Sequence, residues 1–188
     1  MFDNKYDVAL SMMLQGEEGI SKRIQQFMDK MPEKLIKKIK SGKEEATCSN
    51  EGKRWDVYDD GDGLSIAVGS VNNLNKDYMT IHLRKIEDRK VNELLPCFGE
   101  IPVGSVTFYL YNPDNKRQKP LQITFDAVIR RTNDRFYISF ATRTNPFISE
   151  NKDVIEKNGF MDLFEEQIRK GTSVVDMTKV YGYRATKK

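Results

Sequence analysis

The sequence predicts a single α+β domain over residues 1–188, in which N-terminal helices and one C-terminal helix pack on an antiparallel sheet of about six strands. Two observations lead to this prediction. Apolar residues recur at helical spacing through residues 1–42 and at a spacing of two through residues 53–144. Helices grouped ahead of a block of strands are typical of α+β domains. A chain of 188 residues also suits one domain.

Three helices are expected in the N-terminal region. Asp3 can cap the first helix, and Gly16 is a natural stop for it. The second helix carries an apolar stripe from Ile20 to Met31 at steps of three and four. Because proline is tolerated in a first turn but not inside a helix, a third helix begins at Pro32, and Gly42 ends it.

Six strands are expected to follow, with apolar side chains at alternate positions and therefore on one face. We expect Phe125 and Phe140 to be buried on that face. Two Asp-Gly dipeptides predict a hairpin turn, and the prolines and glycines of residues 92–104 predict a long connection. A helix is expected over residues 151–171, followed by a tail or edge strand over residues 172–188. The strands are expected near residues 53–58, 64–69, 79–84, 106–110, 121–129 and 136–140.

Composition limits the class of protein. Ten Phe and eight Tyr are too many for a disordered chain, and a net charge of +3 alone does not indicate a nucleic-acid or membrane partner. The sequence shows neither a signal peptide nor an apolar run of about 18 residues, so we expect a cytoplasmic protein without integral membrane association. Cys48 and Cys97 are expected to be free thiols, although a disulfide between them stays open.

No metal or cofactor site is predicted. The four aspartates between residues 56 and 62 suggest calcium, but the EF-hand pattern fails. With Gly61 as the loop glycine, the twelfth position is Ala67, where glutamate is required. The glycine patterns of dinucleotide and phosphate-binding loops are also absent from the sequence.

His82 is the single histidine, and a Ser-His-Asp or Cys-His site would require it. Alternation places it on the polar face of the sheet, where Asp126 also lies. The two residues are two strands apart, about 9–10 Å, which is beyond a hydrogen bond. We therefore expect a solvated histidine and assign no catalytic residue, while a catalytic pair of carboxylates stays open.

The polar face of the sheet is the predicted binding surface. Tyrosine and arginine stack on bases, contact phosphates and are enriched at protein–protein hot spots, although β-propensity also places Tyr and Thr on half-exposed strands. Residues 113–144 carry seven basic and three acidic side chains, a net charge of +4. The expected partner is a protein or a single-stranded nucleic acid. The residues expected to bind it are Arg84, Tyr109, Tyr111, Arg130, Tyr137 and Arg143.

The alternative is a small enzyme or ligand carrier with a pocket between the sheet and the helices. Such a pocket is expected to place a polar residue on the apolar face, and residues 121–129 and 136–140 show none. The sequence therefore favours a non-catalytic binding protein and leaves its oligomeric state undefined.

Overall fold

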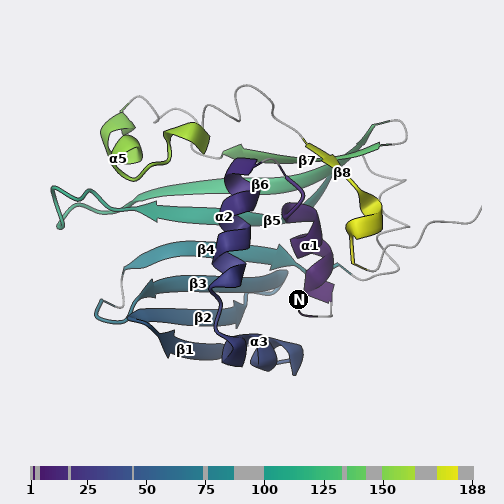
Figure 1. Ribbon diagram of the computed structural model, residues 1–188, viewed down its shortest axis with the longest axis horizontal. Coiled ribbons are helices and arrows are strands. Elements are labelled where there is room, and N and C mark those ends of the chain that lie inside the picture. The colour runs from purple at the N-terminus through teal and green to yellow at the C-terminus, as the bar shows by residue number, and fades with distance from the viewer. Residues whose placement is uncertain are drawn as a thin grey trace, which may run out of the picture.

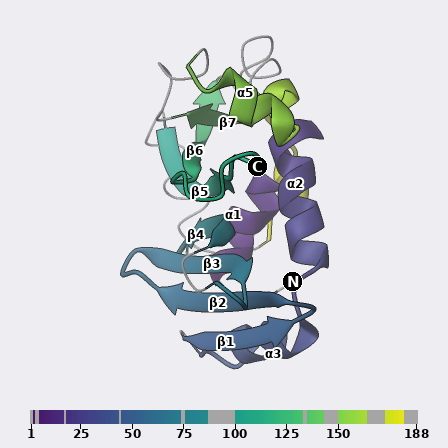
Figure 2. The same cartoon turned by 90° about the vertical axis from the view of Figure 1, so that its left-hand side faces the viewer.

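The computed structural model describes residues 2, 5–16, 18–43, 45–73, 76–86, 100–132, 135–142, 150–163 and 173–181. These residues form the α+β fold that the sequence predicts, with an antiparallel sheet of eight strands (Figure 1). Helices α1 and α2 lie across the strands on one side of the sheet (Figure 2). Within the described residues, no helix has the length and apolar character needed to cross a membrane.

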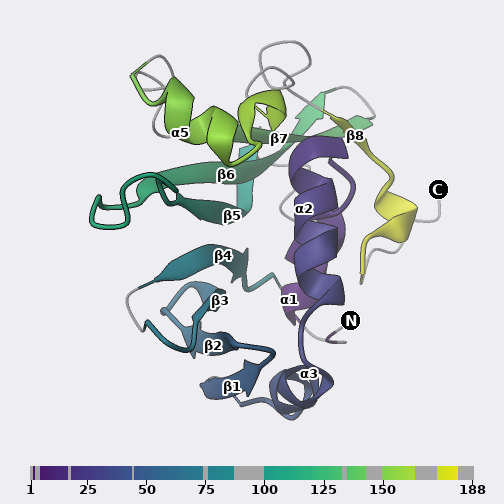
Figure 3. The ribbon, with the colours of Figure 1, turned by 60° about the vertical axis from the view of Figure 1, so that its left-hand side comes forward.

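The three N-terminal helices agree with the prediction. They are α1 (Lys5–Met13), α2 (Glu18–Asp29) and α3 (Glu33–Lys40). Pro32 directly precedes α3, as expected for a residue that has no amide hydrogen to give to a helix interior. Figure 3 shows α3 beside the first strand and α5 (Lys152–Lys157) at the opposite end of the fold.

Each strand pairs antiparallel with the next strand in the chain, so the spatial order of the sheet is its sequence order. The count is eight rather than six. The first added strand has only half-buried and exposed side chains, and the last has three residues, which matches the predicted edge strand within residues 172–188. The strands are β1 (Ala46–Asn50), β2 (Lys53–Asp59), β3 (Gly63–Ser70), β4 (Asp77–Arg84), β5 (Glu100–Leu110), β6 (Leu121–Thr132), β7 (Arg135–Thr142) and β8 (Ser173–Val175).

Two predicted boundaries are wrong. Strand β5 begins at Glu100 instead of residue 106, and an irregularity between Pro102 and Gly104 lets it contain a proline. The expected helix over residues 151–171 is interrupted: α5 ends at Lys157, because Gly159 has a φ of +72°, which a helix cannot contain, and helix resumes at residues 161–163. Residues 87–99 and 164–172 lie outside the described part of the chain.

The apolar face of the sheet and the helices enclose the hydrophobic core. Phe125 is fully buried, as predicted. Phe140 is only half-buried and lies beside Gly16 in the connection between α1 and α2. The predicted burial is therefore confirmed for Phe125 and only partly met by Phe140. The core side of the sheet is therefore the side that the alternation of apolar residues indicates.

Candidate ligand-binding site

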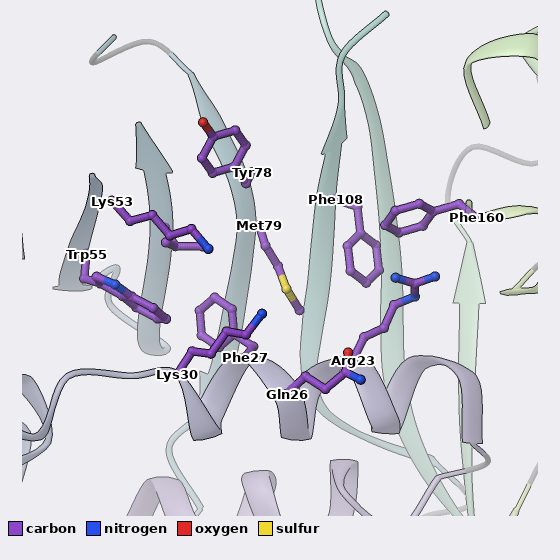
Figure 4. A pocket seen from close by; sticks show the side chains of 11 residues that line it. Arg23, Gln26, Phe27, Lys30, Lys53, Trp55, Tyr78, Met79, Phe108 and Phe160 are labelled. Atoms are coloured by element: carbon purple, nitrogen blue, oxygen red, sulfur yellow. The ribbon is translucent and has the colours of Figure 1, made fainter. Parts of the chain in front are cut away.

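A row of four apolar side chains crosses the sheet and forms the floor of a cavity. The strand register pairs Trp55 with Val68, Val68 with Met79, and Met79 with Phe108. Directly paired residues of neighbouring strands point to the same face of a sheet, so all four side chains face the helices. Together they form a continuous apolar surface from β2 to β5 (Figure 4).

One face of α2 forms the wall of this cavity. Arg23, Gln26, Phe27 and Lys30 line it, and their spacing of three, four and seven residues places them on one side of the helix. The Phe27 ring packs on Trp55 with 5.0 Å between ring centroids and an interplanar angle of 58°. The cavity has a volume of about 240 Å³, the share of about eight water molecules in the liquid.

The end of the cavity is closed by Phe160, which follows α5. Its ring meets Phe108 edge to face at 4.9 Å, and the Arg23 guanidinium lies 4.1 Å from its centroid. Arg23 also donates a hydrogen bond of 3.0 Å to the carbonyl oxygen of Gly159 and lies 3.9 Å from the Asp162 carboxylate. These contacts hold the Arg23 side chain against the Phe160 ring, so Arg23 stabilises the end wall of the cavity.

The mouth of the cavity is positively charged. Lys30 from α2 and Lys53 from β2 both line it and are exposed. Lys53 precedes Trp55 by two residues in β2, so both side chains lie on the same side of the strand. Lys53 is therefore a charged residue on the apolar face. This departure from the alternating pattern of β2 was visible in the sequence, and the prediction overlooked it. Of the eleven described residues that line the cavity, three are basic and none is acidic.

Two of the arginines predicted to bind a partner form ion pairs on the opposite face of the sheet. Arg84 Nη2 lies 3.1 Å from the Asp62 carboxylate, and Arg130 pairs with Glu100. Arg143 falls outside the described residues. A phosphate would therefore have to compete with carboxylates for both described arginines.

The three predicted tyrosines are half-buried. Tyr111 lies with its ring 4.7 Å from the Lys76 ammonium group, and burial raises the pKa of its hydroxyl. Arg130 and Tyr137 are direct neighbours across β6 and β7. The strand register places the described residues in two groups, with Arg84, Arg130 and Tyr137 towards one end of the sheet and Tyr109 and Tyr111 towards the other.

His82 is held by the acidic hairpin between β2 and β3, so the prediction of a solvated histidine is wrong. Its Nδ1 lies 2.9 Å from the Asp60 carboxylate and 3.0 Å from Ser65 Oγ, and its Nε2 lies 3.0 Å from Asp62. Only 16% of the side chain is exposed. The register pairs Ser65 with His82, which brings the turn over the ring.

The groups of the hairpin cluster are paired with one another. Oxygens of Asp60 and Asp62 and a ring nitrogen of His82 lie within 4.8 Å of one another, a donor set that a divalent cation accepts. The hydrogen bond with Asp60, and then the His82 ring and the Arg84 guanidinium, hold the pKa of Asp62 below its usual value of 3.8. Ser65 is buried and donates to Asp60, so its hydroxyl is not presented to a substrate. The cluster is best described as an ion-pair network that fixes the turn.

The cavity and the hairpin cluster lie on opposite faces of the sheet, so they are separate candidate sites. Of the two, the cavity offers both volume and an apolar surface. Comparison of the chain with protein-family models, with curated proteins and with solved structures finds no match.

Proposed function

We propose that this protein binds a small, largely apolar or aromatic molecule in the cavity between α2 and the sheet. The observation that carries the proposal is the cavity of about 240 Å³ between α2 and the row from Trp55 to Phe108. An apolar ligand that fills this volume removes its own apolar surface from water, which contributes about 25 cal/mol per Å².

The described side chains that line the cavity are apolar or aromatic on its floor and basic at its mouth. A cavity with an aromatic floor and a charged mouth resembles a ligand pocket in chemistry, since such pockets are mostly apolar with a few polar groups.

The test uses N-phenyl-1-naphthylamine, an uncharged probe that fluoresces in apolar surroundings. Trp55 is the single tryptophan of the chain and lies in the cavity, so its emission is expected to fall as the bound probe accepts its energy. At about 0.3 kcal/mol per non-hydrogen atom, the probe is expected to bind with a dissociation constant of about 0.2 mM or tighter.

A matched pair of variants locates the site. Val68→Phe enlarges a side chain of the floor and is expected to abolish probe binding. Val174→Phe makes the same change on β8, where the side chain is 55% exposed, and is expected to leave binding unchanged. Equal binding to the Val68 variant, with its unfolding midpoint retained, would show that the cavity is not the site.

We also propose, as a second candidate, that the polar sheet face binds a protein or a single-stranded nucleic acid. The supporting observation is the pairing of Arg130 with Tyr137, next to the exposed side chains of Arg131 and Arg135 at the turn between β6 and β7. Tyrosine beside arginine offers a base both a stacking surface and a charge. Electrophoretic mobility shifts with single-stranded DNA and RNA test the nucleic-acid form of this candidate.

A further inference from the structure

We infer that the ligand of the cavity is an organic acid, with an aromatic or acyl body on the floor and a carboxylate between Lys30 and Lys53. The inference rests on the function proposed above and adds the chemistry of the head group. It follows from the charge of the mouth, from the partners of each basic side chain, and from the spacing between mouth and floor.

The charge of the mouth differs from that of the whole chain. The sequence has 31 basic and 28 acidic side chains, which nearly balance. Among the residues that the structure describes, three basic residues and no acidic one line the cavity. Within the described ranges, no carboxylate forms an ion pair with Lys30 or Lys53. Two ammonium groups at one opening repel each other, and an anion between them removes that repulsion.

Arg23 is the third basic residue, and its existing contacts assign it another role. Its guanidinium is committed to the Gly159 carbonyl oxygen and to the face of the Phe160 ring. The two lysines instead reach over the cavity from opposite sides, Lys30 from α2 and Lys53 from β2 (Figure 4). The head group is therefore assigned to the lysines, and Arg23 supports the wall.

The spacing between head and body favours a compact acid. Lys53 and Trp55 are two residues apart on one side of β2, which is about 6.6 Å along the strand. A carboxylate attached directly or by a few atoms to an aromatic ring or acyl chain spans that distance. The methylene groups of both lysines extend the apolar surface towards the mouth, where they can contact the same body.

A carboxylate fits this mouth better than a phosphate does. Phosphate sites commonly use a helix N-terminus or an arginine fork. The mouth lies instead at the C-terminal end of α2, because Lys30 directly follows the last helical residue, Asp29. The negative end of the helix dipole opposes a phosphate dianion there more than a carboxylate monoanion. Arg23, the one lining guanidinium, is already engaged.

The experiment compares 1-naphthoate with 1-naphthalenemethanol, which share a ring system and differ in charge. Each displaces N-phenyl-1-naphthylamine from the protein, so both affinities come from one signal. An exposed ion pair contributes a factor of about 1.4 to 5, so with two lysines the acid is expected to bind roughly two- to thirtyfold more tightly than the alcohol. Raising sodium chloride from about 20 mM to about 500 mM is expected to remove most of this preference.

Matched double variants identify the lysines. Replacing Lys30 and Lys53 with glutamine is expected to abolish the preference for the acid while retaining affinity for the uncharged probe, which also shows that the variant is folded. Replacing Lys22 and Lys34, which are exposed and do not line the cavity, with glutamine changes the net charge equally and is expected to keep the preference.

Three outcomes would overturn the inference. Equal affinity for acid and alcohol would leave ligand binding intact and exclude the anionic head group. A 1-naphthyl phosphate that binds more than tenfold more tightly than 1-naphthoate would replace the carboxylate with a phosphoryl group. Binding of none of these molecules, nor of the uncharged probe, would overturn the proposed function as well.

Discussion

Replacing Phe125 with alanine removes a fully buried ring from the middle of β6. The ring meets Phe108 edge to face, with 5.9 Å between centroids, and Phe108 in turn forms part of the cavity floor. The substitution therefore tests both the assignment of the core face and the support beneath the cavity. Alanine leaves a cavity at this position. The neighbouring strands cannot move in to close it, because backbone hydrogen bonds on both sides of β6 hold them in place.

The expected cost is about 3–5 kcal/mol of the free energy of unfolding, the usual range for a buried phenylalanine. In a domain of this length each kcal/mol lowers the melting temperature by about 2–4 °C, so the expected shift is roughly 6–20 °C. Native domains are stable by about 5–15 kcal/mol, so a measurable folded population is expected.

Urea unfolding followed by Trp55 fluorescence measures this cost. The slope of free energy against urea is expected to stay constant while the midpoint falls. The control is Val174→Ala, at a side chain that is 55% exposed, which is expected to change stability by less than about 0.5 kcal/mol. An unchanged midpoint for the Phe125 variant would mean that the face assignment is inverted, and the cavity floor with it.

Four further outcomes are expected. Gly104→Ala places a Cβ 2.2 Å from the His82 carbonyl oxygen, so it is expected to lower the unfolding free energy by about 1–3 kcal/mol, and an unchanged urea midpoint would contradict that contact. His82→Ala is expected to leave probe binding in the cavity unchanged, because the imidazole is on the other face; a tenfold weaker affinity would refute the separation of the two sites. Asp62 has a lowered pKa, so its carboxylate stabilises the fold above the usual pKa of 3.8 and loses this effect as the pH falls through the folded value. Asp62→Asn is therefore expected to lower the urea midpoint at pH 7 and to have no effect at pH about 2, whereas equal losses at both pH values would exclude the ion pairs as the cause. If the polar face binds single strands, Tyr137→Ala is expected to weaken binding by about 1–3 kcal/mol, and Arg130→Ala to reduce the salt dependence; no mobility shift at low salt with micromolar wild-type protein would exclude this function.

The elements that sequence could predict are those fixed by local chemistry. Pro32 separates α2 from α3 because it cannot sit inside a helix, and alternation locates six strands. Strand β1 was missed because Ala46–Asn50 is short and has only two weakly apolar side chains, Ala46 and Cys48, which are half-buried. The end of α5 depends on the backbone of Gly159, and a single glycine within a helical pattern is a weak signal.

The polar sheet face was predictable strand by strand, but the cavity was not. Its existence depends on which part of the apolar face α2 leaves uncovered, and helical periodicity does not contain that information. Arg23, Gln26 and Lys30 look like solvated helix positions until the sheet is placed beneath them. The environment of His82 was missed for a similar reason, since a turn distant by about 20 residues folds over it.

The sequential order of the strands has a consequence for how the protein folds. Hairpins joined one after another pair each strand with its neighbour in the chain, so the sheet can grow by adding one strand at a time. The cavity differs, because Arg23 and Gly159, which meet at its end wall, are 136 residues apart. Its wall and end can close only after most of the chain has assembled. A molecule that occupies the cavity therefore recognises the native state alone, and it is expected to act by slowing unfolding rather than by speeding folding.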